Sequence, residues 1–219
     1  METQTRTAAV AGASGLVGGH LLDALLDNPQ YREVLSLGRR PLPRQHPKLV
    51  QRTVDFARLG EEPLPPIDDA FCCLGTTIKK AGSQEAFRAV DHDAVLAFAK
   101  AAKQAGARRF LVVTALGADP RSRVFYNRVK GEVQEALKGM GFESLVILQP
   151  SLLLGERAES RPGERAAIVA SRVLAPLLRP LASRPIDART VARAMAALAQ
   201  AASPGVRVAP SGELQELGR

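Results

Sequence analysis

The sequence predicts an α/β fold in which a doubly wound, mostly parallel sheet carries helices on both faces and a small C-terminal lobe. Short apolar runs typical of strands alternate with helical patterns, and crossovers of that length favour parallel pairing. A glycine-rich turn links the first apolar run to the first helical pattern. Hydrophobic residues make up 46% of the chain and aromatic residues only 4%, which suits a buried parallel sheet packed with Leu, Val and Ala.

The first third of the chain is expected to hold four strands and one helix. The helix ends at Asn28-Pro29, because proline cannot continue a helix and restricts the residue before it. Three prolines between the second and third strands exclude another helix there, and a proline-rich loop covers 61–66. In order, the elements are the strand Thr7–Ala11, the helix Val17–Leu26 and the strands Glu33–Gly38, Val50–Val54 and Asp69–Leu74.

The rest of the chain repeats this alternation until Pro150. A long apolar pattern of helical period covers Gln84–Gln104 and stops at Gly106, and the next helix stops at Gly139. Beyond Pro150 the alternation weakens. The further elements are the strands Phe110–Ala115, Ser144–Gln149 and Val206–Val208 and the helices Tyr126–Lys138, Ile168–Leu178 and Thr190–Ala201, with a polar segment at Arg157–Gly163. We expect one domain over 1–219, in which 151–219 form a wall beside the carboxyl ends of the strands.

The turn after the first strand reads Gly12-Ala13-Ser14-Gly15-Leu16-Val17-Gly18. Gly12 suits a tight turn, Gly15 lets an anion approach the main chain, and Gly18 lets the helix lie close to the strand. Free N–H groups at the start of the helix favour a pyrophosphate. The turn therefore predicts a dinucleotide site formed by Gly12, Ser14, Gly15, Leu16, Val17 and Gly18; the alternative is an ordinary strand-to-helix connection.

The second expected strand ends in Gly38-Arg39-Arg40, at a place where an acidic residue commonly binds the ribose 2′-hydroxyl of NAD. No acid stands there, and a guanidinium binds a 2′-phosphate through two parallel hydrogen bonds. Arg39, with Arg40 second, therefore predicts NADP as the cofactor, with NAD as the other candidate. The alternative is that both arginines are solvated surface residues of an arginine-rich chain.

Residues after the third and fourth strands are expected to line the rest of the dinucleotide. Asp55 would accept a hydrogen bond from the adenine, and Phe56 would pack beside the base. Gly75 permits a close backbone approach to the middle of the cofactor. The lining residues predicted in this way are Asp55, Phe56, Leu74, Gly75 and Thr76.

Tyr126 and Lys130 lie four residues apart in a segment of helical periodicity, which places both side chains on one face of a helix. An ammonium beside a phenol stabilises the phenolate and lowers a pKa that starts near about 10. A tyrosine tuned in this way can act as an acid or a base near neutral pH. Tyr126 is therefore the candidate proton donor or acceptor, and Lys130 would tune it and hydrogen-bond the nicotinamide ribose.

With these motifs the chain resembles the atypical or extended branch of the short-chain dehydrogenase/reductase superfamily. The glycine-rich loop and the segment Tyr126-Asn127-Arg128-Val129-Lys130 match the superfamily. Three segments resemble its Tat-interacting-protein subgroup, namely 73–83, 117–119 and 159–164. The resemblance implies an NAD(P)-binding Rossmann fold and, commonly, hydride transfer to a carbonyl or from an alcohol. It also implies that Pro150 and Ser151 line the nicotinamide.

The superfamily usually has a catalytic serine at the end of the fifth strand. This chain has Thr114-Ala115 there, so Thr114 is the candidate third catalytic residue, and the hydroxyl is missing if Ala115 holds that position. Arg157, Glu159 and Arg161 are candidates for the substrate pocket, with a solvated loop as the alternative.

Composition argues against several other classes. The net charge is +8, but the cations are dispersed among acids, which predicts no nucleic-acid partner. No apolar run has the length of a membrane span and no signal-peptide pattern is seen, so we expect a cytoplasmic protein without a membrane partner. The two cysteines, Cys72 and Cys73, and the three histidines lack metal-ligand spacing, so no metal site is predicted.

These features favour an NADP-dependent oxidoreductase acting on a small carbonyl or alcohol substrate. A second interpretation is an NADP(H)-binding regulatory protein that senses redox state with little turnover, because the chain departs from the family at Thr114-Ala115. A sugar-nucleotide epimerase or dehydratase is a third, for which the C-terminal third is short. A protein partner or a homo-oligomer is compatible with the sequence, although no residue specifies either.

Overall fold

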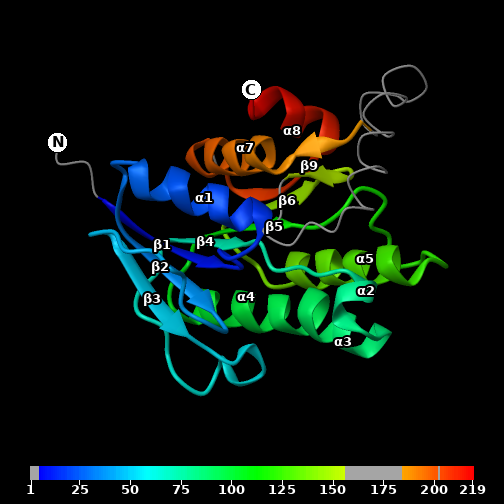
Figure 1. Cartoon of the computed structure of the whole chain (residues 1–219), viewed down its shortest axis with the longest axis horizontal. Helices are drawn as coiled ribbons and strands as arrows, with labels where there is room; N and C mark the ends of the chain where they lie inside the picture. The colour runs from blue at the N-terminus through cyan, green and yellow to red at the C-terminus, as the bar shows by residue number, and fades with distance from the viewer. Residues whose placement is uncertain (1–4, 156–183, 202) are drawn as a thin grey trace.

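In a computed structural model the chain forms a seven-stranded sheet between two layers of helices (Figure 1). The structure describes residues 5–155, 184–201 and 203–219. The strand order is β3-β2-β1-β4-β5-β6-β9, and every pairing within this sheet is parallel. The chain order reverses between β1 and β4, and in such sheets ligands bind at the carboxyl ends of the strands at this point. The predicted α/β class is confirmed.

The strands begin and end close to the predicted limits, because buried apolar runs are bounded by glycine, proline and polar residues. Two are shorter than predicted: β4 ends at Cys72 and β5 ends at Val113, since the residues beyond them leave the ladder. The main strands are β1 Arg6–Ala11, β2 Tyr31–Gly38, β3 Leu49–Thr53, β4 Asp69–Cys72, β5 Arg109–Val113, β6 Ser144–Gln149 and β9 Gly205–Pro210. A separate parallel pair joins β7 (Leu153–Leu154) to β8 (Ile186–Asp187).

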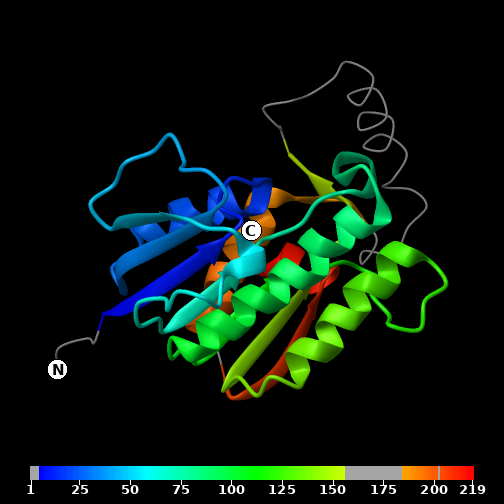
Figure 2. The same cartoon turned by 90° about the horizontal axis from the view of Figure 1, so that it is seen from below.

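Side chains that alternate along the strands build one apolar core on each face of the sheet. On one face the core is closed by α1 (Leu16–Asp27) and α7 (Ala188–Gln200), with α8 (Ser211–Leu217) beside them. On the other face it is closed by α4 (Ala94–Gln104) and α5 (Phe125–Lys138), which cross the sheet in Figure 2. None of the helices in the described ranges is long and apolar enough to cross a membrane.

The helix predicted over Gln84–Gln104 is divided by a change of helix type. It consists of α3 (Gln84–Arg88), the π-helical turn η2 (Ala89–Asp93) and α4, and the short helix α2 (Ile78–Ala81) precedes it. The π-helical turn places the carboxylate of Asp91 inside the protein, where it is 1% exposed. The predicted helix Ile168–Leu178 and the polar segment Arg157–Gly163 lie outside the described residues.

A buried polar cluster ties four strands together at their amino ends. The carboxylate of Asp69 on β4 is fully buried and accepts a hydrogen bond of 2.7 Å from the hydroxyl of Tyr31 on β2. It also pairs with Arg6 of β1 at 3.0 Å and Arg109 of β5 at 2.9 Å. Because an unpaired buried charge is costly, the cluster stabilises the sheet only while these partners are in place.

Candidate active site

The glycine-rich loop connects β1 to α1 with almost no room for side chains. Gly12 has a φ of +90°, and a Cβ on it would lie 2.6 Å from the carbonyl carbon of Cys73. A Cβ on Gly18 would lie 2.1 Å from the carbonyl oxygen of Gly12, so the helix contacts the loop through backbone. The N–H of Gly15 donates to the same carbonyl at 3.0 Å. This geometry fits the tight turn predicted at Gly12 and the close helix contact predicted at Gly18, and the approach of an anion at Gly15 stays a prediction.

The start of α1 presents free backbone donors beside this loop. Gly15 precedes the helix, no side chain caps it, and its first turn has no acidic residue. Ser14 and Gly15 are exposed, Leu16 is half-buried and Val17 is buried. Unpaired N–H groups, a positive helix end and a cradle that a Cβ would fill are the features that a pyrophosphate requires. The residues present therefore fit a dinucleotide.

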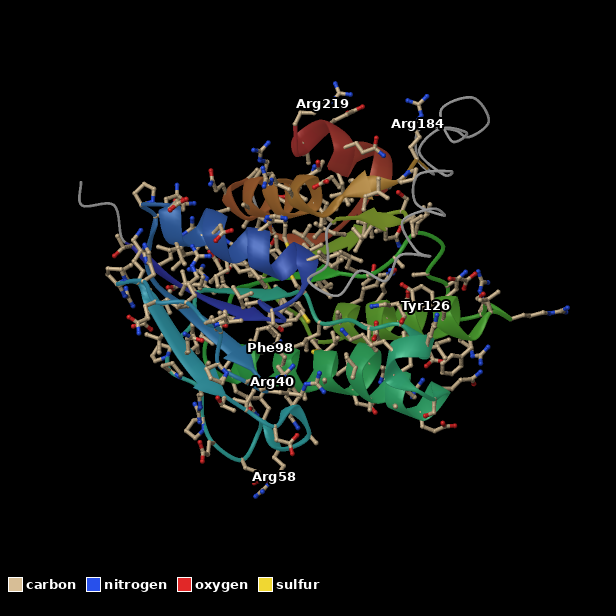
Figure 3. All side chains as sticks on the ribbon, in the orientation of Figure 1. Arg40, Arg58, Phe98, Tyr126, Arg184 and Arg219 are labelled. Carbon is tan, nitrogen blue, oxygen red and sulfur yellow. The ribbon has the colours of Figure 1, made fainter. Side chains whose placement is uncertain are left out.

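Three of the residues predicted near the adenosine half are exposed and one is buried. Arg39 and Arg40 are exposed and follow the end of β2 (Arg40 is labelled in Figure 3). Asp55 is exposed and caps the short helix η1 (Phe56–Arg58) by accepting from the N–H of Ala57 at 3.0 Å. Phe56 is only 7% exposed and packs in the core with residues of α4. The expectation that Phe56 packs beside the adenine is therefore corrected: its ring is a core side chain.

The loop after β4 lies against the helix that carries the tyrosine and the lysine. A Cβ on the exposed Gly75 would lie 3.5 Å from Oδ1 of Asp91 and 3.9 Å from Nζ of Lys130. The backbone N–H of Thr76 donates to Oδ2 of Asp91 at 2.8 Å, and Leu74 is half-buried. Two of the predicted lining residues, Gly75 and Thr76, thus lie beside Asp91, and Asp91 links this loop to Lys130.

Tyr126 and Lys130 lie one turn apart on α5, and their surroundings differ. The ring of Tyr126 is half-buried and packs on Phe87 of α3 with 5.4 Å between centroids (Tyr126 is labelled in Figure 3). Lys130 is 4% exposed, and its Nζ lies 2.7 Å from Oδ1 of Asp91. Asp91 is not among the residues predicted for the site, and its only signal in the sequence is an acid within the apolar helical pattern.

The pKa of Tyr126 differs from the expectation. Burial raises the pKa of this phenol, Lys130 lowers it and Asp91 raises it, and the net direction is upward. Lys130 lowers the pKa of Tyr126 as predicted, but burial and the Asp91 carboxylate outweigh the ammonium, so the pKa lies above its ordinary value and not near neutral pH. The phenol is therefore protonated at neutral pH.

Thr114 does not face the site with a free hydroxyl. Its Oγ1 donates to the carbonyl of Leu148 at 3.0 Å and accepts from Nε2 of Gln134 at 2.8 Å. Gln134 lies two turns beyond Tyr126 on α5, and its own Oε1 accepts from Gln149 at 3.1 Å. The geometry contradicts the catalytic role predicted for Thr114, and the next residue, Ala115, has no hydroxyl to replace it.

The end of β6 is joined to the C-terminal part of the chain. The carbonyl of Pro150 accepts from the N–H of Leu116 at 2.9 Å. The hydroxyl of Ser151 donates to the carbonyl of Arg184 and accepts from the buried Ser211 at 3.0 Å. Pro150 and Ser151 thus hold this connection in place, and their predicted contact with the nicotinamide stays a prediction. The candidates Arg157, Glu159 and Arg161 lie outside the described residues.

Comparison with known proteins identifies the family. No protein-family model matches the chain. The Fmp52 protein of Emericella nidulans is 39% identical over 167 residues, which cover 73% of this chain and 72% of the relative. HTATIP2 of Rattus norvegicus is 39% identical over 166 residues, which cover 74% of this chain and 68% of the relative. The chain belongs to the atypical short-chain dehydrogenase/reductase family of NAD(P)-binding proteins.

Solved structures of short-chain dehydrogenases/reductases share the fold. MoeE5 in complex with UDP-glucose and NAD superposes with a TM-score of 0.72 at 19% identity over 97% of this chain and 80% of that one. WbmH of Bordetella bronchiseptica in complex with NAD⁺ gives 0.68 at 16% identity over 98% and 79%. The expected cytoplasmic location is contradicted, because curated Fmp52 relatives, including that of Coccidioides immitis, are named as mitochondrial.

Proposed function

We propose that this chain is an NADP-dependent oxidoreductase that transfers a hydride between the nicotinamide and a small carbonyl or alcohol substrate. The observation that carries the proposal is the position of Lys130. Lys130 lies one turn from Tyr126 on α5, and its Nζ is close to Gly75 in the loop after β4. The same loop begins at Cys73, whose backbone lies against Gly12 of the glycine-rich loop. Family membership supports a nicotinamide dinucleotide as the cofactor.

Each part of the site has a task in this reaction. When bound, the cofactor supplies or accepts the hydride at its nicotinamide ring. The glycine-rich loop and the start of α1 would hold the pyrophosphate, and Arg39 and Arg40 would pair with a 2′-phosphate. Gly75 leaves room along the ribose, to which Lys130 would donate. Together these residues would hold the nicotinamide in place.

Tyr126 would act as the general acid or base of the reaction. In the direction of reduction its hydroxyl donates a proton to the carbonyl oxygen while the carbonyl carbon receives the hydride, so that an alcohol forms and a phenolate is left. The phenolate then takes a proton from water. Because burial raises the pKa of Tyr126, the protonated donor is the resting form at neutral pH.

The test is turnover of NADPH with a panel of aldehydes, ketones and quinones. Tyr126→Phe should abolish turnover while affinity for NADPH survives. Tyr31→Phe is the matched control, because it removes the other tyrosine hydroxyl, which lies at the amino ends of the strands, and should keep the activity of the folded protein. Turnover that persists in Tyr126→Phe would overturn the assignment.

A second candidate function is an NADP(H) sensor with little turnover. It is favoured by the engaged hydroxyl of Thr114 and by Ala115, because no hydroxyl from this strand end is free to polarise a carbonyl. Tight NADPH binding without turnover on any substrate of the panel would support the sensor. If Ala115→Ser then creates turnover, the missing hydroxyl is the cause.

A further inference from the structure

The loop of residues 39–48 joins β2 to β3 without helix or strand, and one side chain of β3 holds it. The amide oxygen of Gln51 accepts a hydrogen bond from the backbone N–H of Leu42 at 2.7 Å. Its Nε2 donates to the carbonyl of Arg44 at 2.8 Å and to that of Leu42 at 3.4 Å. We call these three hydrogen bonds the Gln51 clamp. The side chain pairs with the loop through both its oxygen and its nitrogen, as a neighbouring strand would.

Two further contacts hold the same loop against α1. Leu42 is half-buried and packs on the apolar core that α1 closes. The guanidinium of Arg44 pairs with the carboxylate of Asp23 on α1. An exposed ion pair contributes little on its own, so the Gln51 clamp and the packing of Leu42 are what fix this part of the loop.

Arg39 and Arg40 lie between two fixed points of the chain. On one side is the last residue of β2, Gly38, which is paired with β3. On the other side the Gln51 clamp begins at Leu42. Pro41 stands between them with a fixed φ, and its ring disfavours the helical conformation for the residue before it. The backbone that carries the two arginines therefore has few accessible conformations.

We propose that Gln51 is a positioning residue for the choice of cofactor: its clamp holds the backbone of Arg39 and Arg40 where a guanidinium meets the 2′-phosphate of NADP. The inference rests on the proposed function, because that function assigns the two arginines to this phosphate. A site that is ordered before its ligand arrives loses less affinity to the ordering of backbone and side chains. Without the clamp the loop must be ordered on binding. This cost falls on NADPH alone, since NADH has no 2′-phosphate.

The charges around the loop agree with this role. The neighbouring arginines of the loop and of β3, Arg44 and Arg52, are each paired with a carboxylate. Arg39 and Arg40 are exposed and form no ion pair with any residue that the structure describes. The amide of Gln51 is uncharged, so it holds the loop without neutralising either arginine, which a carboxylate at this position would do.

The test is calorimetric titration of the nucleotide-free protein with NADPH and with NADH. Gln51→Met keeps the length of the side chain and removes the amide, at an exposed position on an edge strand where the substitution leaves the core intact. We expect affinity for NADPH to fall by about 3- to 10-fold, as the loss of one or two hydrogen bonds implies, and affinity for NADH to stay the same. The matched control Gln45→Met changes an exposed glutamine of the same loop outside the clamp and should leave both affinities unchanged.

A double-mutant cycle shows whether Gln51 acts through the arginines. In the variant Arg39→Ala/Arg40→Ala, adding Gln51→Met should weaken binding of NADPH no further, because the groups that Gln51 positions are gone. An equal additional loss in both backgrounds would overturn the proposal, since Gln51 would then act on the fold. Equal losses of affinity for NADPH and NADH in Gln51→Met alone would overturn it for the same reason.

Hydrogen exchange measures the clamp itself, without any cofactor. The N–H of Leu42 should exchange several times faster in Gln51→Met than in the wild type or in Gln45→Met, and an unchanged rate would overturn the proposal. A wild type that binds NADPH and NADH equally would refute the NADP dependence of the proposed function and, with it, the role of Gln51. A wild type that prefers NADPH, with the same preference in Gln51→Met, would refute only the role of Gln51 and leave the proposed function standing.

Discussion

The helix residue Gly18 touches the carbonyl of Gly12 through backbone alone, at a spacing where a Cβ would lie 2.1 Å from the oxygen. The contact fixes the start of α1 beside the end of β1, and the free N–H groups of the first turn then point toward the loop. The geometry of the phosphate loop is therefore decided by the absence of a side chain at position 18.

Gly18→Ala should destabilise the fold by on the order of 2–4 kcal/mol, since the backbone must separate to admit the methyl group. It should also weaken binding of NADPH. Urea unfolding and calorimetric titration measure the two effects. Gly19→Ala is the matched control: its Cβ would lie 3.5 Å from the carbonyl of Ala13, an ordinary contact, and alanine favours the helix. Equal effects of the two substitutions would contradict this account of the loop.

Arg39→Ala should lower affinity for NADPH by roughly 10- to 100-fold and leave affinity for NADH unchanged, because only NADPH carries a 2′-phosphate for the guanidinium. Fluorescence titration with both cofactors measures this. Arg32→Ala removes an exposed arginine near the other end of β2 and serves as the control for charge. If the wild type binds NADPH and NADH equally, the NADP assignment fails.

Tyr31→Phe should destabilise the protein by about 1–3 kcal/mol at neutral pH, because the buried carboxylate of Asp69 loses a donor. Burial raises the pKa of Asp69 above that of an unfolded chain. Its protonated form is therefore favoured by folding, and this contribution to stability is present at acidic pH and lost as pH rises through the folded pKa. The penalty of Tyr31→Phe should accordingly shrink as pH falls toward about 4. Unfolding curves across this range test it, and a penalty that grows in acid would contradict it.

Both cysteines should resist modification in the folded protein. Burial raises the pKa of the Cys72 thiol to about 12 and also raises the pKa of the half-buried Cys73, so the reactive thiolates are scarce. With a chromogenic disulfide reagent at about pH 8, we expect no fast reaction in the native state and two reactive thiols after unfolding. A thiol that reacts quickly in the native protein would show that this burial is incomplete.

Much of the fold could be predicted from local patterns. The apolar run Ser144–Gln149 coincides with β6, because a strand buried on both faces is recognisable from composition. The seven-residue helix α8 and the two-residue strands β7 and β8 were missed, since segments so short carry no periodic signal. The π-helical turn was also missed, because the apolar spacing continues through it.

The relative positions of the site residues could be predicted only where those residues lie on the same helix or strand. Tyr126 and Lys130 share α5, so their spacing sufficed to bring them together. Asp91 reaches Lys130 from another element, and only tertiary packing brings the two side chains together. The hydroxyl of Thr114 was misjudged because its direction depends on Gln134, a partner on a different element.

The place of β9 at the edge of the sheet bears on how the chain is made. Its residues Gly205–Pro210 pair with Ser144–Gln149, so a nascent chain on the ribosome carries β6 as an open, apolar edge until the later segment emerges. The helix α7, which closes one face of the core, is also synthesised only just before β9. An unpaired edge of this kind is prone to association with other chains. Protection of β6 by a chaperone during translation would therefore matter more for this protein than protection of the strands completed earlier.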